Sequence, residues 1–181
     1  MKPIITISGT PGSGKSTIAK ALVEKYKAKR VYGGAMWRQI AKDRSMTLME
    51  LQKKMINNSE VDIEVDKKAT KETYKLAKDN IVIAEGRPLY HFIPESIKIF
   101  IKEAKVEDVP RTAQLTQKTN QFNLTTHRYS EKDIHNFMLK DNSEVFVVSV
   151  EDRFGSYGLT GVFIAEKNDS LARIDTMLMS C

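Results

Sequence analysis

Residues 9 to 17 read Gly-Thr-Pro-Gly-Ser-Gly-Lys-Ser-Thr, a glycine-rich segment with a lysine and two hydroxyl side chains at its end. A short β-rich run, Pro3 to Ser8, precedes it, and an apolar pattern with helical character follows from Ile18. A strand, a glycine-rich loop and a helix in this order form the context in which G-x-x-x-x-G-K-[ST] is a phosphate-binding loop. The sequence therefore predicts that this loop binds the phosphates of a nucleotide.

Each part of the loop has a physical task. Glycines allow consecutive backbone N–H groups to turn toward phosphate oxygens, and the following helix directs the positive end of its dipole at them. Lys15 supplies a charge to the β- and γ-phosphates of ATP, and Ser16 offers a hydroxyl to Mg²⁺. We therefore expect ATP and Mg²⁺ as cofactors; a glycine turn without a ligand is the alternative. The expected nucleotide-binding residues are Gly9, Gly12, Ser13, Gly14, Lys15, Ser16 and Thr17.

Exposed helices are predicted after the loop. Residues 36 to 42 are helix-like, Thr47 to Glu50 form a capping box that opens a second helix, and residues 62 to 78 carry spaced apolar positions among many charges. These helices would lie over one side of a sheet.

Two short apolar runs predict buried parallel strands, at residues 81 to 84 and 97 to 101. Glu85, Gly86 and Arg87 follow the first of them, where ligands bind in open α/β sheets. Two roles are open for Glu85: it orients Mg²⁺ or its waters, or it forms an ion pair with Arg87.

Charge is unevenly distributed along the 181 residues. The net charge is +6, but residues 1 to 104 carry +8 and residues 105 to 181 carry −2. Lysine outnumbers arginine sixteen to four in the first part, which favours a solvated helical surface serving small anionic nucleotides over a nucleic-acid reader. No apolar run reaches the roughly 20 residues of a membrane span. With Cys181 as the only cysteine, a cytoplasmic protein without a membrane contact is expected.

The first part resembles the short cytidylate kinases of archaeal type over about residues 2 to 104. The resemblance rests on the loop, on Gly33-Gly-Ala-Met-Trp-Arg38, on Asp62-Ile-Glu-Val-Asp66, on residues 81 to 87 and on residues 97 to 101. It implies transfer of the γ-phosphoryl group of ATP to CMP or dCMP with Mg²⁺.

The same resemblance implies roles for residues beyond the loop. Arg38 and Arg87 would hold the phosphate of the acceptor nucleotide and act with Lys15 in catalysis, and Asp62 and Asp66 would border the acceptor site. The alternatives are a surface role for Arg38 and a helix-dipole role for the two aspartates. The family also carries an arginine-bearing lid, whereas this chain offers Arg111 and then no arginine until position 128.

The second part resembles a different family. Residues 111 to 126, with Arg128-Tyr129, Asp152-Arg-Phe-Gly155, Gly158-Leu-Thr-Gly-Val162 and residues 174 to 181, are similar to the C-terminal region of FkbH-like proteins, which is related to N-acetyltransferases of the GNAT kind. These proteins handle glyceryl units on acyl carrier proteins. Two incomplete patterns therefore join at about residues 103 to 111, and a chimera of the two families is one hypothesis for this chain.

Local patterns predict that this second part is folded. Ser130 to Asp133 open a helix, and residues 145 to 150, 159 to 165 and 171 to 179 form an antiparallel meander. An exposed edge at residues 171 to 179 would permit a homodimer as well as a monomer. The glutamines and asparagines at 114, 117, 120, 121 and 123 are expected on helix faces and turns, with a binding surface as the alternative.

Together these patterns predict an α/β fold with a P-loop kinase-like parallel sheet and flanking helices, followed by a small α+β segment with an antiparallel meander. The expected domains are residues 1 to 104 and 105 to 181. Three functions are open: an ATP-dependent kinase of CMP or dCMP, a nucleotide-binding chimera without efficient turnover, or a module that binds a carrier protein or another partner through residues 111 to 181.

Overall fold

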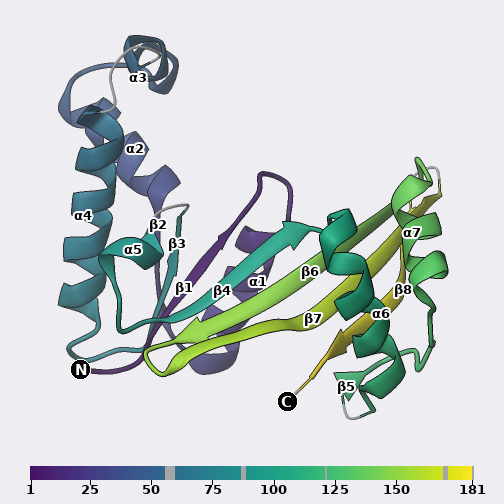
Figure 1. Cartoon of the computed structure of the whole chain (residues 1–181). Coiled ribbons are helices and arrows are strands. Elements are labelled where there is room, and N and C mark those ends of the chain that lie inside the picture. Colours follow the sequence, from purple (N-terminus) through teal and green to yellow (C-terminus); the bar gives the residue numbers. More distant parts are fainter. Residues whose placement is uncertain (56–59, 87–88, 121, 169–170, 181) are drawn as a thin grey trace. The chain divides into compact units, whose positions relative to one another are not determined.

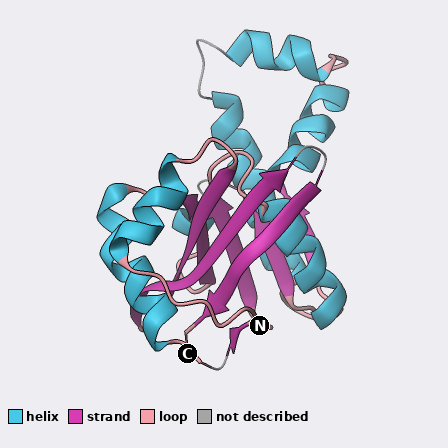
Figure 2. Cartoon of the chain, turned by 90° about the vertical axis from the view of Figure 1, so that its right-hand side faces the viewer, coloured by secondary structure: helices cyan, strands magenta, loops and turns pink. Residues whose placement is uncertain are grey.

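The parallel sheet predicted around the glycine-rich loop is present in the computed structural model (Figure 1), which describes residues 1–55, 60–86, 89–120, 122–168 and 171–180. The chain divides into two units. Unit 1 contains Met1–Ser8 and Gly14–Lys98, and unit 2 contains Gly9–Ser13 and Ile99–Cys181. In each unit, helices pack on strands (Figure 2).

Unit 1 is built on three parallel strands with β3 in the middle. The strands are β1 (Ile4–Gly9), β2 (Lys29–Tyr32) and β3 (Val82–Glu85). Glu85 pairs in register with Ile7 on one side and Tyr32 on the other. All four residues of β3 are buried, as expected for a central parallel strand. The sequence predicted β1 and β3 but not β2.

The helices of unit 1 pack on this sheet and on one another. They are α1 (Lys15–Tyr26), α2 (Gly33–Asp43), α3 (Leu48–Met55), α4 (Glu60–Leu76) and α5 (Leu89–Phe92). The predicted capping box of α3 is present: the Thr47 N–H donates to Glu50 at 2.7 Å, and the Glu50 N–H donates to the Thr47 hydroxyl at 3.2 Å. Val31, Val82 and Ala84 form a buried cluster with residues of α4. Side chains that alternate with these three in their strands point to the opposite face.

Unit 2 has the predicted antiparallel meander of β6, β7 and β8, and the strand order of its sheet is β4, β6, β7, β8, β5. Its elements are β4 (Ile97–Glu103), the 3₁₀ helix Val106–Asp108, α6 (Val109–Lys118), β5 (Phe122–Asn123), α7 (Glu131–Leu139), β6 (Ser143–Asp152), β7 (Gly155–Asn168) and β8 (Leu171–Met179). The edge of this sheet is the two-residue strand β5, which pairs with Leu178 and Met179 of β8. The remaining part of β8 has no partner on that side among the described strands.

The core of unit 2 lies between α6, α7 and one face of the meander. Ile134 of α7 and Val147 and Ile164 of the strands are fully buried there. The predicted start of α7 is confirmed by a capping box, in which the Ser130 N–H donates to Asp133 and the Ser130 hydroxyl accepts from the Asp133 N–H. The segment is therefore a folded element and not a linker.

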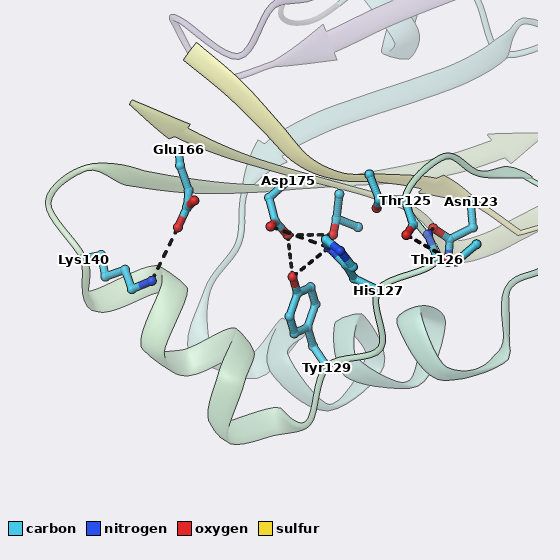
Figure 3. A network of polar contacts seen from close by, with 9 residues as sticks. Asn123, Thr125, Thr126, His127, Tyr129, Lys140, Glu166 and Asp175 are labelled. Atoms are coloured by element: carbon cyan, nitrogen blue, oxygen red, sulfur yellow. Dashed lines mark hydrogen bonds and ion pairs between the residues drawn. The ribbon is translucent and has the colours of Figure 1, made fainter. Parts of the chain in front are cut away.

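Strand β8 contains a bulge next to a polar network. Ile164 of β7 pairs with Thr176 and Ala165 pairs with Ile174, so Asp175 is an extra residue in β8. A bulge re-aims side chains, and Asp175 is directed at the loop before α7 (Figure 3). There the Tyr129 hydroxyl donates to Asp175 at 2.7 Å, and His127 Nδ1 lies 3.1 Å from the same hydroxyl.

The hydropathy of the helices bears on whether one of them could cross a membrane. Over the ranges given above, the structure contains no helix with the length and apolar character needed to cross a bilayer.

Candidate nucleotide-binding site

The carboxyl ends of β1, β2 and β3 lie at the same edge of the unit 1 sheet, because the three strands are parallel and in register. Each strand is followed by a segment with polar or glycine residues: the glycine-rich loop, the start of α2, and Gly86. This edge is where open α/β sheets bind ligands.

The backbone of the loop has the conformation that its glycines permit. Gly12 and Gly14 have φ values of 80° and 77°, a region that other residues rarely adopt. The N–H groups of Thr17 and Ile18 both donate to the Gly14 carbonyl at 3.0 Å, so α1 begins immediately at the end of the loop. Lys15 is the first residue of that helix.

Ser16 and Glu85 are brought together by this arrangement. The Ser16 hydroxyl donates to Glu85 Oε1, although the two residues are 69 positions apart in the sequence. Backbone contacts hold the end of β3 in place: the Gly86 N–H donates to the Ile7 carbonyl at 3.3 Å, and the Ser8 hydroxyl donates to the Gly86 carbonyl at 2.9 Å. A carboxylate beside a hydroxyl is the hard oxygen donor set that Mg²⁺ requires, so these residues fit the metal.

Arg30 of β2 is an unexpected member of the site. Its Nη2 lies 2.5 Å from Glu85 Oε2, with 20% and 10% of the two side chains exposed. The partner of Glu85 in the structure is therefore Arg30, whereas Arg87, the partner considered from the sequence, lies outside the described residues. This salt bridge joins two strands that are distant in the sequence, so it leaves no local sequence signal. It depends on the parallel register of β2 and β3, which the structure gives.

Arg38 and Tyr32 continue the same group of contacts. Arg38 lies on α2 and is exposed, and its Nη2 donates to the Tyr32 hydroxyl. The guanidinium carbons of Arg30 and Arg38 lie 4.6 and 5.3 Å from the centre of the Tyr32 ring, within the range of cation–π attraction. Polar and π contacts therefore connect Ser16, through Glu85, Arg30 and Tyr32, to Arg38.

The two aspartates at the start of α4 differ in their surroundings. Asp62 is exposed, while Asp66 is partly buried. Burial raises the pKa of the Asp66 carboxyl above its usual value, and the negative charge of Asp62 raises this pKa further. Perturbed carboxyl groups occur both at functional sites and in structural clusters.

The Gln and Asn residues predicted on helix faces and turns of unit 2 do make contacts within that unit. Gln117 donates to the Tyr129 carbonyl at 3.0 Å, and Asn123 accepts from the Thr126 N–H at 2.8 Å. Gln114 lines a groove along α6 together with Gln117 and Tyr129. Gln121 lies outside the described residues. These contacts fix the connection between α6 and α7.

Sequence comparisons identify relatives for the part of the chain that forms the site. A family model described as an AAA domain matches residues 8–127. The chain is 42% identical over 86 residues to the cytidylate kinase of Pyrococcus horikoshii, covering 48% of this chain and 43% of that protein. It is 34% identical over 112 residues to the cytidylate kinase of Thermococcus kodakarensis, covering 61% and 56% of the two chains. The chain thus spans about half of the length of these relatives.

A solved structure with partial similarity is the shikimate kinase of Bacteroides thetaiotaomicron, which is 15% identical, with a TM-score of 0.38 and 76% of each chain covered. An overlap this loose carries no weight for the assignment. The family match covers well over half of the chain and includes the loop, Ser16 and Glu85. The chain therefore belongs to the family of AAA domains whose model matches residues 8–127, and cytidylate kinases are among its relatives.

Proposed function

We propose that the protein is an ATP-dependent nucleoside monophosphate kinase that transfers the γ-phosphoryl group of ATP to CMP or dCMP. The observation that carries this proposal is the hydrogen bond from Ser16 to Glu85, in a chain whose sequence contains the complete G-x-x-x-x-G-K-[ST] pattern. It supports a site for a nucleotide with its metal, because a hydroxyl and a carboxylate stand together where the helix α1 begins.

The proposed roles follow from the chemistry of phosphoryl transfer, which depends on positioning and charge neutralisation. The loop amides and Lys15 would bind the β- and γ-phosphates, and Ser16 with Glu85 would hold Mg²⁺. Bound Mg²⁺ supplies positive charge to the phosphate oxygens. Arg38 and Arg87 would hold the acceptor phosphate, which is already anionic, so no general base is required. Asp62 and Asp66 would border the acceptor.

Cytosine as the base of the acceptor nucleotide is supported by the identity to cytidylate kinases over about half of the chain. The test is coupled ATP consumption with CMP, dCMP, UMP and AMP in turn, beside calorimetric titration of Mg·ATP. Turnover with CMP or dCMP alone is the expected result. Turnover with AMP and not with the cytidine nucleotides would overturn the proposed acceptor.

A second candidate function is nucleotide binding without efficient turnover. Phosphoryl transfer needs cationic cover for the transferring group, usually from a lid. The arginines nearest in sequence to a lid position are engaged within unit 2: Arg111 donates to the Leu159 carbonyl at 3.3 Å, and Arg128 donates to the Thr116 carbonyl at 2.9 Å. Binding of Mg·ATP in the calorimeter without turnover for any acceptor would select this candidate.

We also propose that residues 1 to 104 and 105 to 181 are domains of different origin, the second from FkbH-like proteins. The change of net charge supports this, and so does a boundary between units after Lys98. The family match that continues to residue 127 argues for a later junction or a single origin. If residues 111 to 181 bind an acyl carrier protein, the full chain should bind this partner and a chain without residues 111 to 181 should not. A cytoplasmic location and a monomer or homodimer stay predictions.

A further inference from the structure

Arg30 occupies a position that the proposed metal site would be expected to leave free. Its guanidinium lies 2.5 Å from Glu85 Oε2, while the other carboxylate oxygen accepts from Ser16. Both oxygens of the proposed metal ligand are therefore engaged within unit 1. The residue that engages the second oxygen carries the same sign of charge as the metal.

The burial of this pair makes the contact specific. Glu85 is 8% exposed. Arg30 Nε is buried and makes no hydrogen bond with any described residue. A guanidinium that gives up hydration in this way needs a compensating charge. Glu85 is the acidic group within ion-pair distance of it in the described part of the chain. The fixed position of Arg30 over the Tyr32 ring, at 4.6 Å, restricts the guanidinium further.

The charge balance at this edge of the sheet then disfavours a bare cation. Arg30 neutralises the single negative charge of Glu85, and the Ser16 hydroxyl carries no charge. A divalent ion approaching without a nucleotide meets no net negative charge at its two protein ligands, and like charges at short range repel strongly in a partly buried site. A nucleotide triphosphate brings several negative charges and reverses this balance.

We propose that Arg30 is a positioning residue that keeps Glu85 from binding a divalent cation on its own, so that the metal enters the site together with the phosphates of the nucleotide. This inference rests on the proposed function, because it concerns the same site. It assigns to Arg30 a role in the order of binding: the nucleotide–metal complex binds, and the free metal does not.

The test uses the full chain and Mn²⁺ as the probe, followed by the electron paramagnetic resonance signal of free Mn²⁺. Arg30→Met removes the charge and keeps an unbranched side chain, whereas Arg30→Lys keeps the charge. Arg44→Met is the matched control, since Arg44 forms a 2.5 Å pair with Glu64 elsewhere in unit 1, with 45% and 34% of the side chains exposed. Without nucleotide, Arg30→Met should bind Mn²⁺ at least tenfold more tightly than the wild type, and the other two variants should match the wild type. With ATP present, the difference should shrink.

Two results would overturn the inference. In the first, Arg30→Met binds Mn²⁺ no more tightly than the wild type; in the second, it binds more weakly, which would mean that Arg30 holds Glu85 ready for the metal. Circular dichroism and Trp37 fluorescence report whether Arg30→Met folds. If Arg30→Met does not fold, Arg30→Gln takes its place, because glutamine is uncharged and can still donate to Glu85. Failure of the proposed function is distinct, because it appears in the wild type, either as no binding of Mg·ATP in calorimetry or as binding without turnover for any acceptor.

Discussion

Replacing Tyr129 by Phe removes one hydroxyl from the polar network of unit 2 and keeps the ring contact with Phe137, whose centre is 5.0 Å away. The hydroxyl donates to Asp175, a residue that is 7% exposed. A hydrogen bond to a charged group contributes about 1.5–3 kcal/mol. Since the Thr176 hydroxyl still donates to Asp175 at 2.9 Å, we expect Tyr129→Phe to lower the free energy of unfolding by about 2 kcal/mol, in the lower half of that range.

The same variant should change the alkaline pH dependence of stability. Burial, followed by the hydrogen bond to Asp175, raises the pKa of Tyr129 from 10.0 to about 12. The folded state thus favours the neutral hydroxyl, whose contribution is complete below the unfolded pKa near 10 and is lost as pH rises through about 12. The stability difference between the wild type and Tyr129→Phe should therefore narrow across this interval.

The assay is urea unfolding followed by far-ultraviolet circular dichroism, because this signal follows the helices and strands of both units, whereas Trp37, the only tryptophan, lies in unit 1. Tyr157→Phe is the matched control: Tyr157 is 56% exposed and donates to Asp152 at 3.0 Å, so its loss should cost no more than about 0.5 kcal/mol. Equal losses for the two variants, or a difference that stays constant above pH 10, would refute this account of the network.

Three further substitutions test the loop and a helix start. Lys15→Ala should remove most of the affinity for Mg·ATP in calorimetry while leaving the circular dichroism spectrum intact, and unchanged affinity would refute the loop assignment. Gly14→Ala places a side chain at a φ of 77°, so thermal unfolding followed by Trp37 fluorescence should show a loss of about 1 kcal/mol; no loss would mean that the loop does not hold this conformation. Ser130→Ala removes the acceptor for the Asp133 N–H and should lower the free energy of unfolding in urea by about 1 kcal/mol, whereas an unchanged midpoint would count against the cap.

The elements with a strong local pattern could be predicted from the sequence. The glycine-rich loop fixed the order of strand and helix around it, and buried apolar runs indicated β3 and the meander. Strand β2 was missed because Lys29-Arg-Val-Tyr32 contains one buried residue, Val31, between polar or partly exposed neighbours. Its strand conformation depends on pairing with β3, which is distant in the sequence.

The residues of the site also divide into those with a local sequence signal and those without one. Ser16 and Glu85 were both proposed as metal ligands, one from the loop pattern and one from the end of a strand, and the structure brings them into hydrogen-bond contact. Arg30 was not predicted, since its ion pair with Glu85 depends on the register of two strands 55 residues apart along the chain. Asp175 was not predicted either, because a bulge changes which face a strand residue occupies without altering the apolar pattern enough to be noticed.

Asp175, the extra residue in β8, takes no part in the pairing of β7 with β8. Ile164 and Ala165, consecutive in β7, pair with Thr176 and Ile174, so the pairing scheme already omits position 175. Deleting that one codon would bring Ile174 and Thr176 together as consecutive residues opposite Ala165 and Ile164, and the strand could pair without a gap. The pairing of β7 with β8 therefore does not need Asp175. The use of this residue lies in its carboxylate, which accepts from Tyr129 and so anchors the loop that leads into α7.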